Sequence, residues 1–151
     1  MGVFSSFPAN IDTNVRSRYI IGEDWKKMLN CIIVGLGGFI GAVLRYLIGL
    51  LPVNPQNGFP IKTLFINIIG AFVIGMVVAL GARKNWNAQF ILFLKVGICG
   101  GFTTFSSFAL ETNQLIERGA GWSAACYVVC SVVGAVAAVF AAQLICASYP
   151  R

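Results

Sequence analysis

The sequence predicts an all-helical integral membrane protein with four transmembrane helices, and three observations lead to this fold class. Of the 151 residues, 58% are hydrophobic and only 11% are charged, whereas a soluble domain has about 25% charged residues. The mean hydropathy of +0.81 comes from four long apolar segments. Because a bilayer core about 30 Å thick needs about 20 apolar residues per helix, these segments fill most of the chain and leave no room for a separate soluble domain.

The four predicted spans are separated by short segments of turn and polar residues. They cover residues 31–51, 61–81, 90–110 and 122–149. Each span is rich in Gly, Ala or Ser, which allows helix backbones to approach one another closely inside a membrane.

Residues 1–27 differ in character from the rest of the chain. They are polar and lack the long apolar core of a signal peptide. We therefore expect two parts: residues 1–27 form a polar N-terminal extension that is either not translated or disordered, and residues 28–151 form the four-helix membrane domain. Met28 is a second possible start of translation, and we favour it as the working one.

Basic residues are distributed unequally between the two sides of the predicted membrane domain. The side with the N-terminus has seven basic residues: Arg16, Arg18, Lys26, Lys27, Arg83, Lys84 and Arg151. The other side has two, Lys62 and Arg118. This excess predicts a cytoplasmic N-terminus. A chain that begins at Met28 has three against two, and such a weak bias predicts insertion in both orientations.

Several classes of function are disfavoured by composition. The net charge of +6 indicates anchoring at the membrane surface rather than nucleic-acid binding, because no basic run alternates with aromatic residues. The chain has no histidine, the commonest general base. Its five cysteines all lie in apolar stretches without Cys-x-x-Cys spacing, so neither a disulfide framework nor a cysteine metal site is indicated.

The middle of the third segment carries the most unusual residues. Gly100-Gly101 followed by Thr103-Thr104 predicts a helix break near the bilayer midplane. A break there frees backbone carbonyls that can ligate a cation. The alternative is a packing face of small residues.

Two phenylalanines follow this break. Phe105 and Phe108 share a helix face because they are three residues apart, and the positive edges of their rings can meet an anion. Asn67 lies in the middle of the second segment, where a polar side chain is costly. It can either bond to a neighbouring helix or donate its amide hydrogens to an anion in a narrow pore.

The remaining polar residues give weaker signals. Arg45 can extend to the interface or raise the local anion concentration at a pore mouth. Tyr127 and Ser131 lie four residues apart and continue a polar line on the fourth helix. Lys95 and Glu111 are expected to be interfacial charges.

Three motifs resemble the fluoride-specific channel family known as Fluc or CrcB. They read Gly-Gly-Phe-Ile-Gly-Ala-Val-Leu-Arg-Tyr at 37–46, Thr-Leu-Phe-Ile-Asn-Ile-Ile-Gly-Ala-Phe at 63–72 and Gly-Gly-Phe-Thr-Thr-Phe-Ser-Ser-Phe-Ala-Leu-Glu at 100–111. The resemblance covers the chain from about Met28 to the C-terminus, and the fourth helix matches only in character.

The resemblance implies a passive fluoride channel in the cell inner (plasma) membrane that exports cytoplasmic fluoride. It implies an antiparallel, dual-topology homodimer, or a pair with an oppositely oriented homologous subunit. It implies a structural sodium ion at the dimer centre, bound by the backbone carbonyls of Gly100 and Thr103. Arg45 falls in the vestibule, and the fluoride path falls on Asn67, Phe105, Ser107 and Phe108, and less sharply on Tyr127 and Ser131.

Two rival functions are open at this point. A small dual-topology multidrug exporter needs an intramembrane carboxylate for proton exchange, and no Asp or Glu occurs between Asp24 and Glu111. A non-transporting membrane assembly subunit is the other rival, and the polar residues in the middle of two spans argue against it. An enzyme is not expected, because no histidine or acid pair is available inside the membrane.

Overall fold

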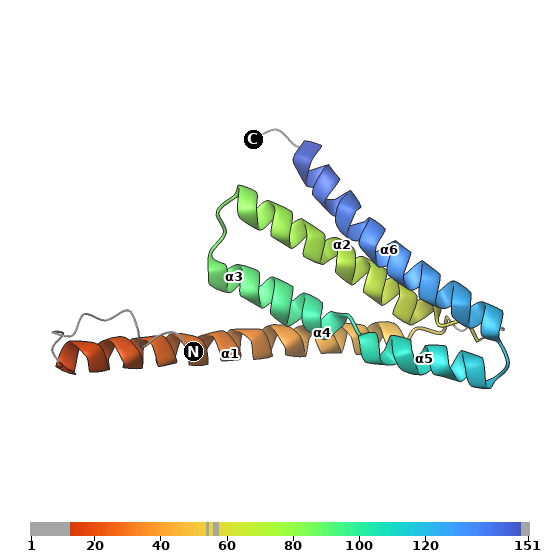
Figure 1. Cartoon of the computed structure of the whole chain (residues 1–151), viewed down its shortest axis with the longest axis horizontal. Coiled ribbons are helices and arrows are strands. Elements are labelled where there is room, and N and C mark those ends of the chain that lie inside the picture. The colour runs from red at the N-terminus through yellow and green to blue at the C-terminus, as the bar shows by residue number, and fades with distance from the viewer. Residues whose placement is uncertain (1–12, 54, 56–57, 149–151) are drawn as a thin grey trace. The chain divides into compact units, whose positions relative to one another are not determined.

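The structure, a computed structural model, describes residues 13–53, 55 and 58–148, and every regular element in this part of the chain is helical (Figure 1). Four stretches are long and apolar enough to cross a membrane: Gly22–Gly49, Ile61–Arg83, Ala88–Glu117 and Gly121–Ser148. The predicted all-helical class with four spans is confirmed.

The elements in order are α1 (Thr13–Gly49), α2 (Ile61–Arg83), α3 (Ala88–Leu92), the π-helix η1 (Phe93–Cys99), α4 (Gly100–Phe102), α5 (Phe105–Glu117) and α6 (Gly121–Ser148).

The N-terminal unit of the chain ends at Ile32, and its described part is helical from Thr13 onward. The two alternatives for residues 1–27, that they are not translated or that they are disordered, stay predictions. Glu23 pairs with Lys26 at 3.4 Å and Asp24 pairs with Lys27 at 3.2 Å, which is the i,i+3 spacing that supports an exposed helix. The first twelve residues of the predicted extension lie outside the described residues.

The second unit begins at Ile33, and its most extensive helix contact joins α2 and α6, which lie side by side in Figure 1. Glycines make this close approach possible. A Cβ atom at Gly75 would lie 2.9 Å from that of Ala142, and one at Gly134 would lie 2.8 Å from Cδ1 of Ile68. The packing role expected of small residues is confirmed at these positions.

The C-terminal part of α1 meets the third span in the same way. A Cβ atom at Gly37 would lie 2.7 Å from the carbonyl oxygen of Phe93 and 2.8 Å from Cα of Gly97. One turn later, Gly41 faces the backbone of Ile98 and Gly101. Backbone therefore packs on backbone here, and larger side chains would separate the two elements.

The third span is interrupted where the sequence predicts a break, although two residues later than the glycine pair. Gly100 is still helical, with φ −64° and ψ −39°. Thr103 and Thr104 adopt extended angles, with ψ of 156° and 116°. The span also contains the seven-residue π-helix η1, which the sequence did not reveal. π-Helices are rare, and they occur frequently at functional sites.

Candidate functional site

A side chain from α2 forms hydrogen bonds with the extended backbone at the break in the third span. Asn67 donates from Nδ2 to the carbonyl oxygen of Thr104 at 3.1 Å, and its Oδ1 accepts from the Thr104 backbone N–H at 2.9 Å. This reciprocal pair gives the extended Thr104 peptide the hydrogen bonds that a helix would otherwise supply. Asn67 is therefore positioned at the break.

The hydrogen bonds around the break leave a specific set of carbonyls available. Thr103 donates from both its backbone N–H and its hydroxyl to the Cys99 carbonyl oxygen, at 3.0 and 2.9 Å, and this ends α4. The Gly100 carbonyl would normally accept from the N–H of Thr104, which goes to Asn67 instead. Among the described residues, no donor outside the helices reaches the Gly100 or Thr103 carbonyl oxygen.

Arg45 contacts the same break from α1. Its Nε donates to the Gly101 carbonyl oxygen at 3.2 Å, and the side chain is partly buried. The guanidinium thus satisfies the Gly101 carbonyl and does not bond to those of Gly100 and Thr103. Arg45 does not simply extend to the interface, which was one of its two interpretations.

Thr104 begins α5 by capping it. Its hydroxyl oxygen accepts from the Ser107 backbone N–H at 3.2 Å and lies 3.1 Å from Ser107 Oγ, which is the role of a threonine N-cap. The hydroxyls of Thr104, Ser106 and Ser107 therefore form one cluster at the start of α5.

A cavity of about 430 Å³, here called the phenylalanine cavity, gathers four of the predicted path residues. It is lined by Asn67, Phe105, Phe108 and Ser131, together with small and apolar residues of α2 and α6. The rings of Phe105 and Phe108 lie 5.4 Å apart between centroids. Ser131 is 7% exposed, and its Oγ has no hydrogen-bond partner among the described residues. An unpaired buried hydroxyl beside an amide is suited to binding an anion.

A second cavity of about 450 Å³, here called the arginine cavity, holds two other predicted residues. Arg45 and Ser107 line it with Lys62, Thr63 and Glu111. It shares Thr104 with the phenylalanine cavity. Of the predicted path residues, the structure therefore places Ser107 in this cavity and four others in the phenylalanine cavity, while Tyr127 lines neither.

The hydroxyl of Tyr127 is not directed into an open cavity but is part of a hydrogen-bonded network that the sequence did not reveal. Glu111 accepts from the Tyr127 hydroxyl at Oε2 and from the Thr63 hydroxyl at Oε1, both at 2.7 Å. Tyr127 is fully buried, and its ring lies 5.2 Å from that of Phe108 and 5.6 Å from that of Phe59.

Glu111 is thus more than the interfacial charge that the sequence suggested. Its carboxylate links α5 to α2 and α6. The only sequence signal for this network was that Glu111 ends the third motif and Thr63 begins the second. Two hydroxyls and a carboxylate on three separate spans give no local sequence pattern from which their contact could be predicted.

Comparison with known proteins decides the family. The family model described as "CrcB-like protein, Camphor Resistance (CrcB)" matches residues 32–143. The chain belongs to the CrcB family. It is a multi-pass membrane protein. Two observations support this: four helices are long and apolar enough to cross a membrane, and its relatives are named as ion channels.

Those relatives carry the name "Fluoride-specific ion channel FluC". The relative from Agrobacterium fabrum is 47% identical over 76% of this chain and 93% of its own length. The relative from Ruminiclostridium cellulolyticum is 52% identical over 62% of this chain and 74% of its own length. The relative from Mesorhizobium japonicum is 42% identical, and its whole length aligns with 82% of this chain.

Proposed function

We propose that this CrcB-family chain is a subunit of a fluoride-specific ion channel that lets cytoplasmic fluoride leave passively. The observation that carries the proposal is the phenylalanine cavity, where an amide, an unpaired buried hydroxyl and two aromatic rings line one space. The names of the relatives support the same function. No catalytic step is involved, and the channel reduces fluoride toxicity by export alone.

Selection follows from the way fluoride is hydrated. Fluoride binds its water tightly, so a pore must replace that water with close donors. Asn67 uses one amide hydrogen on Thr104 and has a second one to offer. The Ser131 hydroxyl and the ring edges of Phe105 and Phe108 add further positive sites.

The carbonyls at the break fit the sodium ion that the family implies. Gly100 and Thr103 would hold it, because the N–H groups of Thr104 and Ser107, which a continuous helix would direct to these two carbonyl oxygens, bond to Asn67 Oδ1 and Thr104 Oγ1 instead. The ion would supply positive charge that neutralises converging carbonyl dipoles. Hard oxygen ligands of this kind suit an alkali cation.

The working unit that we propose is an antiparallel dimer in the cell inner membrane, either of two identical chains or of this chain with an oppositely oriented homologue. Phe105 lines the phenylalanine cavity, yet its side chain is 79% exposed in the single chain. A second subunit would cover this side and complete the wall of the path.

Fluoride efflux from liposomes tests the proposal. The purified chain is reconstituted with trapped fluoride, release is followed with a fluoride electrode, and chloride-loaded liposomes serve as the selectivity control. Phe105→Ile keeps an apolar side chain but removes the ring edge, so fluoride-selective release by wild type should be lost in this variant. No release from well-folded dimer would favour an assembly subunit or an obligate partner chain.

A further inference from the structure

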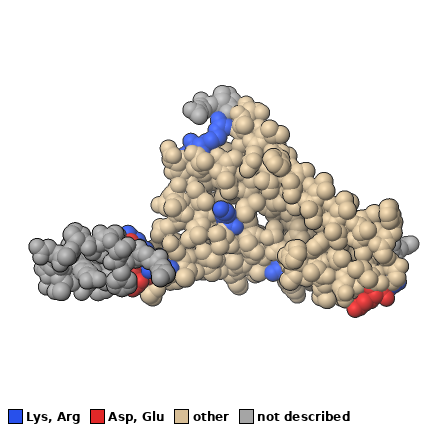
Figure 2. Space-filling view, in the orientation of Figure 1, with Lys and Arg blue, Asp and Glu red and all other residues tan. Residues whose placement is uncertain are grey.

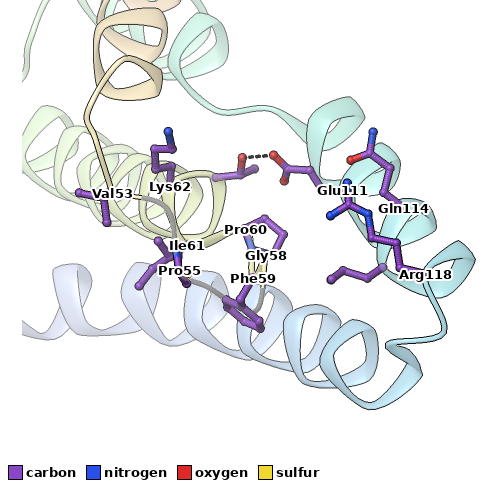
Figure 3. Close-up of a pocket in the computed structure, with 12 residues that line it drawn as sticks. Val53, Pro55, Gly58, Phe59, Pro60, Ile61, Lys62, Glu111, Gln114 and Arg118 are labelled. Atoms are coloured by element: carbon purple, nitrogen blue, oxygen red, sulfur yellow. Dashed lines mark hydrogen bonds between the residues drawn. The ribbon is translucent and has the colours of Figure 1, made fainter.

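A third cavity, of about 220 Å³, lies between the connection from α1 to α2 and the end of α5. It is here called the loop cavity, and none of the residues predicted to form the fluoride path, the vestibule or the sodium site lines it. Figure 3 shows Arg118 and Gln114 extending from α5 on one side and Lys62 on the other, with Glu111 between them. The loop cavity therefore combines two cations with one carboxylate.

The two cations come from different elements, Lys62 from the first turn of α2 and Arg118 from the end of α5. Arg118 follows α5, and its Nη1 lies close to the chain at Gly58, where an added Cβ would be 3.3 Å away. Lys62 donates from Nζ to the carbonyl oxygens of Gly49 and Leu51 at 2.8 and 3.2 Å. Neither cation belongs to an ion pair among the described residues.

The carboxylate of Glu111 is already engaged. Both of its oxygens accept hydrogen bonds, from Thr63 and Tyr127, so it forms the inner wall of the loop cavity rather than a partner for the two cations. The loop cavity consequently presents an excess of positive charge to a solute that enters it.

The loop cavity adjoins the other two cavities. Lys62, Thr63 and Glu111 line both the loop cavity and the arginine cavity. On the opposite side of Glu111, Tyr127 contacts Phe108, which lines the phenylalanine cavity. A small anion in the loop cavity is thus one side-chain layer from the proposed path.

We propose that the loop cavity is an anion-access mouth, in which Arg118 and Lys62 concentrate fluoride before it reaches the path. This inference rests on the proposed channel function. A cleft with an excess of one sign of charge focuses the field and raises the rate of entry of the opposite charge. The attraction is long-ranged at low ionic strength, where the Debye length is about 30 Å at 0.01 M, and it is largely screened at 1 M.

The test is the initial rate of fluoride efflux at low fluoride concentration in R118K, R118Q and R118E, measured at low and high ionic strength with an impermeant salt. Arg118 is chosen because Lys62 also caps α1 and its loss could disturb folding. At low salt R118K should match wild type. R118Q should be about twofold slower and R118E about fourfold slower, the order expected for unit charges about 10 Å away in water. At high salt the differences should vanish.

The matched control is K84Q, which removes an exposed cation from the connection between α2 and α3; its rate should equal wild type at both salt concentrations. Equal low-salt rates across the Arg118 series would overturn the mouth alone. The mouth would also be overturned if the efflux rate of R118Q stayed low at high salt and the variant lost a co-purified phospholipid. That result would assign the two cations to binding a lipid headgroup. A wild-type chain that releases no fluoride, either alone or together with an oppositely oriented homologous subunit, would overturn the channel function and the mouth with it.

Discussion

Asn67 shows how a single polar side chain can serve both structure and transport. Its amide exchanges two hydrogen bonds with Thr104 and so replaces the helical bonds lost at the break. The two interpretations open from the sequence, an interhelical bond or an anion donor, are therefore compatible. An amide has two donor hydrogens and an acceptor, and only one of those hydrogens is used on Thr104.

Substitution at Asn67 should separate these two roles. Asn67→Ala leaves the Thr104 N–H and C=O unpaired, so the free energy of unfolding should fall by about 1–3 kcal/mol and fluoride efflux should be lost. Asn67→Asp keeps the acceptor for the N–H, and it should retain part of the stability while efflux is still lost, because a carboxylate repels an anion. Thermal unfolding in detergent and electrode-measured efflux give the two readouts.

The control for Asn67 is Asn113→Ala on α5. Among the described residues, the exposed amide of Asn113 bonds only to Glu117, at 2.8 Å. It should leave efflux unchanged and alter stability little. Full efflux from Asn67→Ala would contradict the assignment of this amide to the path.

At residue level the sequence indicated most of the site but not its bonding. Asn67 could be selected as a costly polar residue at mid-span, the two phenylalanines by their position after the break, and Ser131 more weakly by its spacing from Tyr127. The structure places Asn67, Phe105, Phe108 and Ser131 around one cavity. The network of Glu111 with Thr63 and Tyr127 could not be predicted, because its members lie on three separate spans. Only the packing of α2, α5 and α6 brings them together.

At the scale of elements, glycines decide how closely α1 can approach the third span. Gly37 and Gly97 face one another, and Gly101 faces the backbone of Gly38. Interhelical hydrophobic driving force is weak in lipid, so close van der Waals contact of this kind has to provide much of the association. The position of Arg45 at the break depends on this contact because Arg45 follows Gly41 by one turn.

Alanine substitutions in α1 should reveal this contact. Gly37→Ala places a Cβ atom 2.7 Å from the Phe93 carbonyl oxygen, so the elements must separate, at a cost of about 1–3 kcal/mol. Gly35→Ala meets nothing within 4 Å and should be neutral or stabilising by up to about 1 kcal/mol. Both are compared by thermal unfolding in the same detergent, and equal melting temperatures would contradict the close contact.

Element bounds could be predicted from hydropathy only where the chain changes character sharply. The break follows from Gly100-Gly101 and Thr103-Thr104, although the extended residues are the threonines alone. α1 begins at Thr13 rather than near residue 31, because hydropathy marks where a span enters lipid and not where a helix starts. The π-helix η1 could not be predicted, since no residue preference marks an i→i+5 turn.

At the scale of the whole molecule, charge is confined to few places. Figure 2 shows that the face in view of the described second unit is mostly free of acidic and basic side chains, as expected of a surface in contact with lipid. The basic residues that can orient the chain are therefore those at the ends of the spans and in residues 1–27. Four of these, Arg16, Arg18, Lys26 and Lys27, lie before Met28.

The N-terminal cations should set the orientation of the full chain. C-terminal fusions to a cytoplasm-active fluorescent protein and to a periplasm-active phosphatase report the side of the C-terminus, which four spans place on the same side as the N-terminus. The full chain should be fluorescent with little phosphatase activity, because seven cations on one side outweigh two.

A chain that begins at Met28 should give both signals, and so should the full chain with all four of Arg16, Arg18, Lys26 and Lys27 changed to Gln. The Gln variant is the matched control for length, because it keeps the extension and removes only its positive charge. Dual insertion of the Met28 chain but not of the Gln variant would assign the bias to the extension itself. A fixed orientation in all three would contradict the charge argument, and would require the antiparallel partner to be a different chain.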